Sequence, residues 1–221
     1  ESQARAGDTP KAQRTFRQVA DMAKRFNDAQ RLARAALWYG GVGITAGGVD
    51  KTLVALLEDA LRMLPKADGA LRARALARLA VELYWSERRR QGVALSQEAL
   101  AMARRLGDPV ALVDALTARH LTLWRPEEVE ELLAGGDEIL HLAEAADDAD
   151  RMFLGHAWRV PALLSLGDIE GVEREVTATA SLARTTRSKP WTSVPTSTTG
   201  SGSRRSGWHA WRWSASRLPS S

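Results

Sequence analysis

The sequence predicts an all-α fold: an α-solenoid of antiparallel helix pairs, each about 40 residues long, followed by a non-helical or disordered C-terminal tail. The first observation is a ladder of aspartates spaced 40 residues apart, at Asp28, Asp68, Asp108 and Asp148. A fixed period of this length is typical of stacked repeats. The second is composition, because Ala and Leu dominate the apolar residues, whereas alternating runs rich in Val and Ile are scarce. That balance favours helices over strands.

The third observation is that apolar residues come into register when the chain is aligned on this period. One column holds Ala20, Ala60, Leu100, Leu140 and Ala180. Further columns hold Ala23, Met63, Ala103, Ala143 and Ala183, and then Ala35, Ala75, Ala115 and Gly155. Small side chains repeated on one helix face let neighbouring helices approach closely.

The predicted helices alternate between the first and the second member of each pair. First helices are expected near 9–26, 50–64, 90–105, 127–146 and 168–184, and second helices near 29–39, 69–85, 109–123 and 149–165. Each aspartate of the ladder is expected to cap the helix that follows it, because its carboxylate accepts hydrogen bonds from free N–H groups of the first turn. Pro109, directly after Asp108, suits the first helical position. The pairs Gly7-Asp8 and Gly167-Asp168 are expected to open helices in the same way.

The repeats divide the chain into a domain and a tail. The helical repeat domain covers 1–187, with repeats near 8–47, 48–87, 88–127 and 128–167 and a partial repeat at 168–187. The tail, 188–221, is dominated by Ser, Thr, Gly, Pro, Arg and Trp and loses the helical periodicity.

Three interpretations of the tail stay open. It is a disordered extension, a nucleic-acid-binding segment, or the product of a frameshift. Arg204 and Arg205 near Trp208, Trp211 and Trp213 interleave charge with stacking surface, as single-strand binding requires. We favour the frameshift, because Trp-Arg-Trp encoded by GC-rich codons becomes Leu-Ala-Leu after a shift of one base. Leu and Ala are the apolar residues that dominate the helical domain.

The net charge of +4 comes from the C-terminal segment 185–221, which holds six basic residues, while no acidic residue follows Glu175. Residues 1–184 carry 25 basic and 27 acidic residues. The repeat body therefore gives no electrostatic reason to expect nucleic acid.

The composition also bears on the compartment and on metal sites. The chain has no cysteine, which excludes disulfides and thiolate metal sites and favours a reducing, cytoplasmic environment. No apolar run approaches the roughly 20 residues needed to cross a bilayer, so we expect no membrane association. The chain begins at Glu1 rather than Met, which indicates a piece of a longer protein.

No motif predicts catalysis, a cofactor or a metal. The glycine-rich segment 40–48 has the G-x4-G spacing at Gly43 and Gly48, but Lys51 and Thr52 come two residues too late for a phosphate loop. We interpret it as a loop between repeats with a glycine helix stop. The four histidines show no metal-ligand spacing. The sequence thus predicts a protein that is not an enzyme.

The candidate partner-binding residues are aromatic and basic side chains at or near the ends of second helices. They are Trp85, Arg119, His120, Trp124, Trp158 and Arg159, with Trp38 in register with Trp158. Two interpretations stay open: the rings fill gaps between stacked pairs, or they line a partner groove, since aromatic and Arg residues are favoured binding anchors.

The segments 1–41 and 94–124 resemble successive tetratricopeptide-type helix pairs, with joints of the form RRLGD at 104–108. The variant of about 40 residues resembles the helical repeat region of large bacterial ATP-binding signalling regulators, including LuxR-family, activator and cyclase-associated types. The resemblance covers about 1–187 and implies an ATPase module and a DNA-binding domain elsewhere in the parent protein. Neither module lies in this chain, so no residue here is assigned to either activity.

Function is therefore expected at the level of binding. The first hypothesis is a scaffold or ligand-sensing module that receives a protein partner or a small inducer, in a larger bacterial signalling or transcriptional regulator. The alternative is that it is part of an ATP-hydrolysing LuxR-type transcription factor. A third, less favoured, is a nucleic-acid binder acting through the basic Trp/Arg tail. Homo-oligomer formation also stays open.

Overall fold

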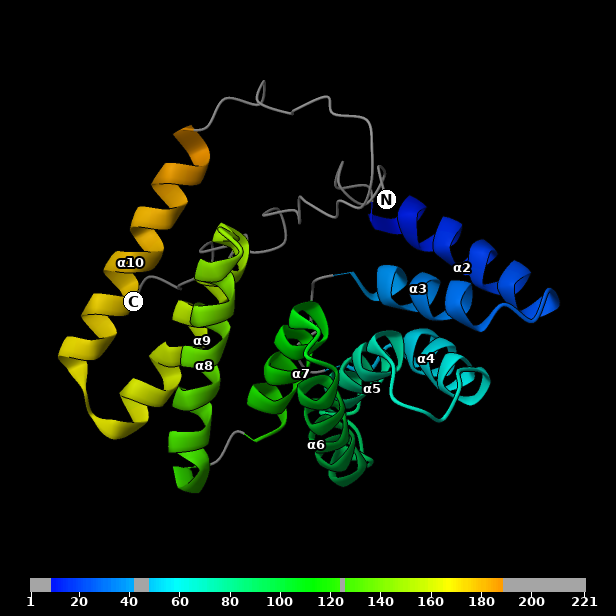
Figure 1. Cartoon of the computed structure of the whole chain (residues 1–221), viewed down its shortest axis with the longest axis horizontal. Helices are drawn as coiled ribbons and strands as arrows, with labels where there is room; N and C mark the ends of the chain where they lie inside the picture. Colours follow the sequence, from blue (N-terminus) through cyan, green and yellow to red (C-terminus); the bar gives the residue numbers. More distant parts are fainter. Residues whose placement is uncertain (1–8, 42–47, 124–125, 189–221) are drawn as a thin grey trace, which may run out of the picture.

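The computed structural model describes residues 9–41, 48–123 and 126–188, and within these ranges it contains nine α-helices, one short 3-10 helix and no strand (Figure 1). The helices are α2 (Thr9–Arg25), α3 (Ala29–Gly40), α4 (Lys51–Met63), α5 (Ala70–Glu82), α6 (Arg89–Leu106), α7 (Pro109–Thr122), α8 (Val129–Ala145), α9 (Ala149–Leu166) and α10 (Ile169–Ser188), with η1 at Pro126–Glu128. The prediction of an all-α fold is confirmed.

The helices stack as antiparallel pairs in a solenoid. Each helix packs against the next along the chain, and second helices of neighbouring pairs also meet, α3 with α5 and α5 with α7. An ion pair shows the period directly: Arg74 Nε on α5 lies 2.7 Å from Asp114 Oδ2 on α7, and the two residues are 40 positions apart. The stacking of second helices therefore follows the sequence repeat.

Four of the junctions between successive helices share one kind of turn, in which a left-handed residue precedes a capping aspartate. The left-handed residues are Asn27 (φ 51°), Gly107 (φ 63°), Asp147 (φ 48°) and Gly167 (φ 75°). The aspartate that follows each of them accepts a hydrogen bond from a backbone N–H of the new helix: Asp28 at 2.8 Å, Asp108 at 2.8 Å, Asp148 at 3.1 Å and Asp168 at 2.8 Å. The N-cap prediction is confirmed at these positions; Asp8 lies outside the described residues.

Asp68 is the exception, and the prediction that it caps a helix is wrong. Gly69 is the N-cap of α5 and makes no side-chain cap bond. The Asp68 carboxylate instead accepts two hydrogen bonds from Arg105, at 2.7 and 3.0 Å, and these lower the pKa of Asp68. Pro65 follows the end of α4, and position 67 is Ala, whose Cβ disfavours the left-handed conformation that the other turns use.

The core runs along the array between the helices. The small-residue column of the second helices is buried throughout, at Ala35, Ala75, Ala115 and Gly155. The first-helix column is buried at Ala20, Ala60, Leu100 and Leu140 and ends at Ala180, which is exposed. One apolar cluster fills α2–α5 and a second fills α5–α8, while the third, at the α7–α9 junction, contains only Leu123, Val129, Leu132 and Ala162 among fully buried residues.

Three further predictions concern the end of α3, the segments beyond the described helices, and membrane spans. Gly41 (φ 58°) ends α3 and donates its N–H to the carbonyl of Trp38, as a glycine helix stop does. The loop 42–47 lies outside the described residues, as does the tail beyond Ser188, the last residue of α10. In the described part of the chain, no helix has both the length and the apolar character to cross a membrane.

Candidate functional site

A cavity of about 160 Å³ lies where α6, α7 and α8 meet. Its lining residues are Leu100 and Arg104 from α6, Leu116, Arg119 and His120 from α7, and Glu131, Leu132, Ala134, Gly135 and Glu138 from α8. The walls combine leucine side chains with charged groups. A volume of this order holds a group the size of benzene.

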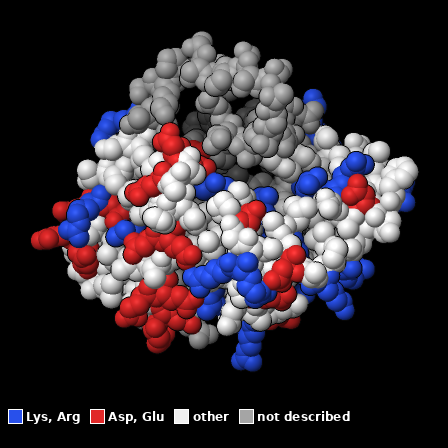
Figure 2. Space-filling view, in the orientation of Figure 1, with Lys and Arg blue, Asp and Glu red and all other residues white. Residues whose placement is uncertain are grey.

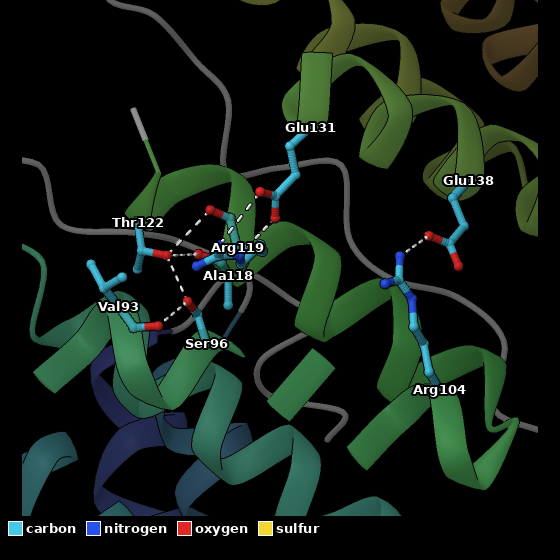
Figure 3. A network of polar contacts seen from close by, with 8 residues as sticks. All are labelled: Val93, Ser96, Arg104, Ala118, Arg119, Thr122, Glu131 and Glu138. Atoms are coloured by element: carbon cyan, nitrogen blue, oxygen red, sulfur yellow. Dashed lines mark hydrogen bonds and ion pairs between the residues drawn. The ribbon is translucent and has the colours of Figure 1, made fainter. Parts of the chain in front are cut away.

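The charged residues around the cavity form two ion pairs that both end on α8 (Figure 3). Arg119 Nε lies 2.9 Å from Glu131 Oε1, and Arg104 Nη2 lies 2.9 Å from Glu138 Oε2. Glu131 and Glu138 are seven residues apart and so share a face of the helix. Because each cation has its own anion, the cavity carries no net charge from these four residues.

Arg119 holds an unused donor at this site. Its side chain is 14% exposed, and its Nη1 is buried without a hydrogen-bond partner among the described residues. A buried donor without an acceptor costs free energy, and a guest that brings a carbonyl or carboxylate oxygen would recover it once the guanidinium turns Nη1 toward the cavity. The cavity is therefore suited to a group that combines an apolar body with an oxygen acceptor.

His120 lines the cavity from α7 and contacts Trp158 on α9. It is 4% exposed, and its ring centroid lies 4.3 Å from that of Trp158 on α9, with the planes tilted by 37°. Burial lowers the pKa of His120 to about 4, so the imidazole is neutral near pH 7. The indole Nε1 of Trp158 is also buried without a hydrogen-bond partner in the described ranges.

The α6–α7 side of the cavity is fixed by a buried polar contact. The hydroxyls of Ser96 and Thr122 lie 2.8 Å apart, and each also reaches a carbonyl of its own helix (Figure 3). Thr122 reaches the carbonyls of Ala118 and of Arg119. The backbone that carries Arg119 is therefore held against α6. The 40-residue register gave no signal for this pair.

Arg159, the neighbour of Trp158, belongs to a second network that ties α9 to its two flanking helices. Its guanidinium lies 2.6 Å from Asp137 on α8 and 3.2 Å from Glu175 on α10. Glu175 is 7% exposed and also lies 2.5 Å from Nδ1 of His156. Arg159 therefore acts as a tie between helices in this structure, next to the cavity rather than in it.

The remaining predicted residues lie elsewhere. Trp38 is 39% exposed and stacks on Phe16, with centroids 6.1 Å apart. Trp85 is 51% exposed and meets Tyr84 edge to face. Trp124 lies outside the described residues. The structure thus brings Arg119, His120 and Trp158 together, with Arg159 beside them, and leaves Trp38 and Trp85 on other parts of the array.

Sequence reasoning missed a buried ion pair on α5. Arg78 lies 2.8 Å from Glu82 on the same helix, and its two Nη atoms donate to the carbonyls of Gly40 and Gly41 at the end of α3. Burial raises the pKa of Glu82. The four-residue spacing of Arg78 and Glu82 could have predicted their ion pair on one helix. Nothing in the sequence indicated that Arg78 also donates to backbone carbonyls at the end of α3.

The surface on the α8 side of the cavity is acidic (Figure 2). Figure 2 shows acidic side chains gathered on the side of the molecule where Figure 1 places α8 and α10. Glu127, Glu128, Glu130 and Glu131 lie at or just before the first turn of α8, where negative charge suits the helix dipole. Within the described ranges, no three His, Asp or Glu residues are placed to hold a metal ion.

Comparison with known proteins adds no family to these observations. No family model matches the chain, and no curated protein matches it. The resemblance to the tetratricopeptide-like regions of bacterial regulators stays a prediction from the sequence.

Proposed function

We propose that this chain is a non-catalytic binding module of the helical-repeat type, and that the cavity between α6, α7 and α8 receives an apolar side chain from a peptide segment of a protein partner. The observation that carries the proposal is a cavity with leucine side chains in its wall beside the unused Nη1 donor of Arg119. An apolar side chain would fill the space between the leucines, and a carbonyl of the same segment would accept the hydrogen bond from Arg119.

The surroundings favour a partner segment with basic flanks. The glutamates at the start of α8 give this side of the molecule a negative potential, which attracts positive charge and speeds encounter. Arg104 and Arg119 are already neutralised by Glu138 and Glu131, so they do not oppose such a partner. In this proposal the partner's apolar side chain supplies most of the affinity, and attraction between its basic flanks and the glutamates of α8 orients it.

As part of a longer signalling regulator, the module would relay binding through α8. The cavity is closed on one side by α8, which the two ion pairs and a small apolar cluster hold to the preceding helices. If α8 can pack against the preceding helices in two ways, a ligand that binds one packing more tightly shifts the equilibrium toward it. Movement of α8–α10 would then carry the signal.

The test is a selection of peptides from a random display library on the full chain, followed by affinity measurements with synthetic peptides. In the key variant, Gly135→Leu, the new side chain fills the cavity; a Cβ at this position lies 3.8 Å from Leu116 Cδ2, which is ordinary contact. The matched control, Gln18→Leu, adds the same side chain at an exposed position of α2. Circular dichroism and thermal melting establish that both variants fold.

We expect selected peptides to share an apolar residue and basic neighbours. Their affinity should fall by about tenfold or more in Gly135→Leu, fall less in Arg119→Gln, and stay unchanged in Gln18→Leu. Peptides that bind Gly135→Leu as well as the wild type would place the binding surface elsewhere. Failure to enrich any peptide over the empty matrix would remove the support for a peptide-binding module.

A further inference from the structure

The outer face of α10 is exposed at positions that are buried in every earlier first helix. In register with Val176 stand Phe16, Leu56, Ser96 and Gly136, all buried, whereas Val176 is 53% exposed. In register with Ala180 stand Ala20, Ala60, Leu100 and Leu140, again all buried, whereas Ala180 is exposed. In α2, α4, α6 and α8 this face is closed by packing within the array. In the described residues, no second helix follows α10.

The same face carries an ordered distribution of charge. Residues 169, 173, 176, 180 and 184 follow the helical spacing of three to four and therefore form one stripe along α10. Ile169 is 57% exposed, and Glu173 and Arg184 are exposed on either side of Val176 and Ala180. The stripe thus has an apolar middle, a negative charge toward its N-terminal end and a positive charge at its C-terminal end.

We propose that this stripe binds α10 of a second copy of the chain, with the two helices antiparallel about a twofold axis. In that arrangement Val176 and Ala180 of one copy face the apolar middle of the other. Glu173 of each copy pairs with Arg184 of the other copy, so the same ion pair forms at both ends of the interface. A twofold interface requires such self-complementarity, because the same patch serves both subunits.

The pairing repeats the way this chain packs its own helices. Every first helix from α2 to α8 is covered by an antiparallel second helix, as α8 is by α9. In the dimer, α10 of the partner takes the place that a second helix takes in the earlier pairs. An interface built around a single helix is small, so we expect a weak and reversible dimer.

Sedimentation velocity of the full chain over a concentration series tests the proposal. We expect the wild type to shift from monomer to dimer as concentration rises. Val176→Glu should raise the dissociation constant by about tenfold or more by placing a charge in the apolar middle. Glu173→Arg and Arg184→Glu should each weaken the dimer by setting like charges opposite each other, and the double variant should restore it.

Glu144→Arg is the matched control, because it reverses an exposed charge on α8, away from the stripe, and should leave the dimer unchanged. A wild type that stays monomeric at every concentration would overturn the proposal, and would leave the face to a different partner. Association that survives Val176→Glu would assign it to another surface. A double variant no better than the single ones would overturn the antiparallel twofold arrangement. The peptide selection does not depend on any of these outcomes.

Discussion

At the residue scale, His120 links burial to the pH dependence of stability. Its folded-state pKa of about 4 lies below the ordinary value of 6.5, because burial disfavours the imidazolium. Between these values the unfolded chain binds a proton that the folded chain does not, so stability is lost as the pH falls from 6.5 to 4. The shift corresponds to roughly 3 kcal/mol of unfolding free energy. We predict that His120→Gln loses less stability than the wild type on acidification.

Urea unfolding followed by circular dichroism, near pH 7 and at about pH 4.5, measures this difference. His141→Gln is the control, because His141 is exposed on α8, and its pH dependence should follow that of the wild type. Carboxylates that titrate in the same range contribute equally to all three proteins. Parallel curves for His120→Gln and the wild type would show that His120 is not the residue responsible.

At the element scale, the turn between helices explains why one aspartate of the ladder behaves differently. Asp108 follows the left-handed Gly107 and caps α7, and its carboxylate forms no ion pair with any residue that the structure describes. We predict that Asp108→Ala lowers the unfolding free energy by about 1 kcal/mol. Asp68→Ala removes only an exposed contact with Arg105 and should cost much less.

Chemical denaturation of both variants in low and high salt separates the two roles. The loss in Asp108→Ala should persist in salt, because it comes from an unsatisfied N–H group. Any loss in Asp68→Ala should shrink, because it comes from a surface ion pair. Equal, salt-independent losses would mean that Asp68 also caps a helix in solution.

The helices were predictable from the sequence because their signals are local. Apolar spacing, aspartate caps and glycine stops each act within a few residues, and the observed helix ends lie close to the predicted ones. The failure at Asp68 had a local signal as well, since Ala67 stands where the other turns carry Asn, Gly or Asp. Propensity at one position decided whether the aspartate of that turn became a cap.

The candidate site was predictable only in part, because it depends on contacts between distant segments. The sequence singled out Arg119, His120, Trp158 and Arg159 by type and position. It did not reveal that Glu131 pairs with Arg119 and that Glu138 lines the same cavity, nor that Gly136 leaves room for Arg159. A Cβ at Gly136 would lie 2.6 Å from Arg159 Cγ. Such approaches depend on how helices cross, which the repeat period does not specify.

At the scale of the whole molecule, burial is uneven along the array. The helices α5 to α7 lie inside the stack and share their faces with neighbours on both sides. Among the described residues α10 contacts only α9 extensively, and within 169–184 it buries just Gly171 and Glu175. In a solenoid each unit is stabilised by its own packing and by its neighbours, so a terminal helix lacks one of those contributions. Stability should therefore decline toward α10.

We predict that amide hydrogen exchange of the full chain is slowest in α5–α7 and fastest in α10, because local opening requires less free energy where fewer groups are buried. Mass spectrometry of exchanged peptides measures the gradient. If α10 pairs with a second copy, its exchange should slow as protein concentration rises, while that of α5–α7 stays constant. The Val176→Glu variant should abolish the concentration dependence and keep the gradient. Uniform protection from α2 to α10 would show instead that the array unfolds as one cooperative unit, and that the end helix is stabilised by contacts beyond those described.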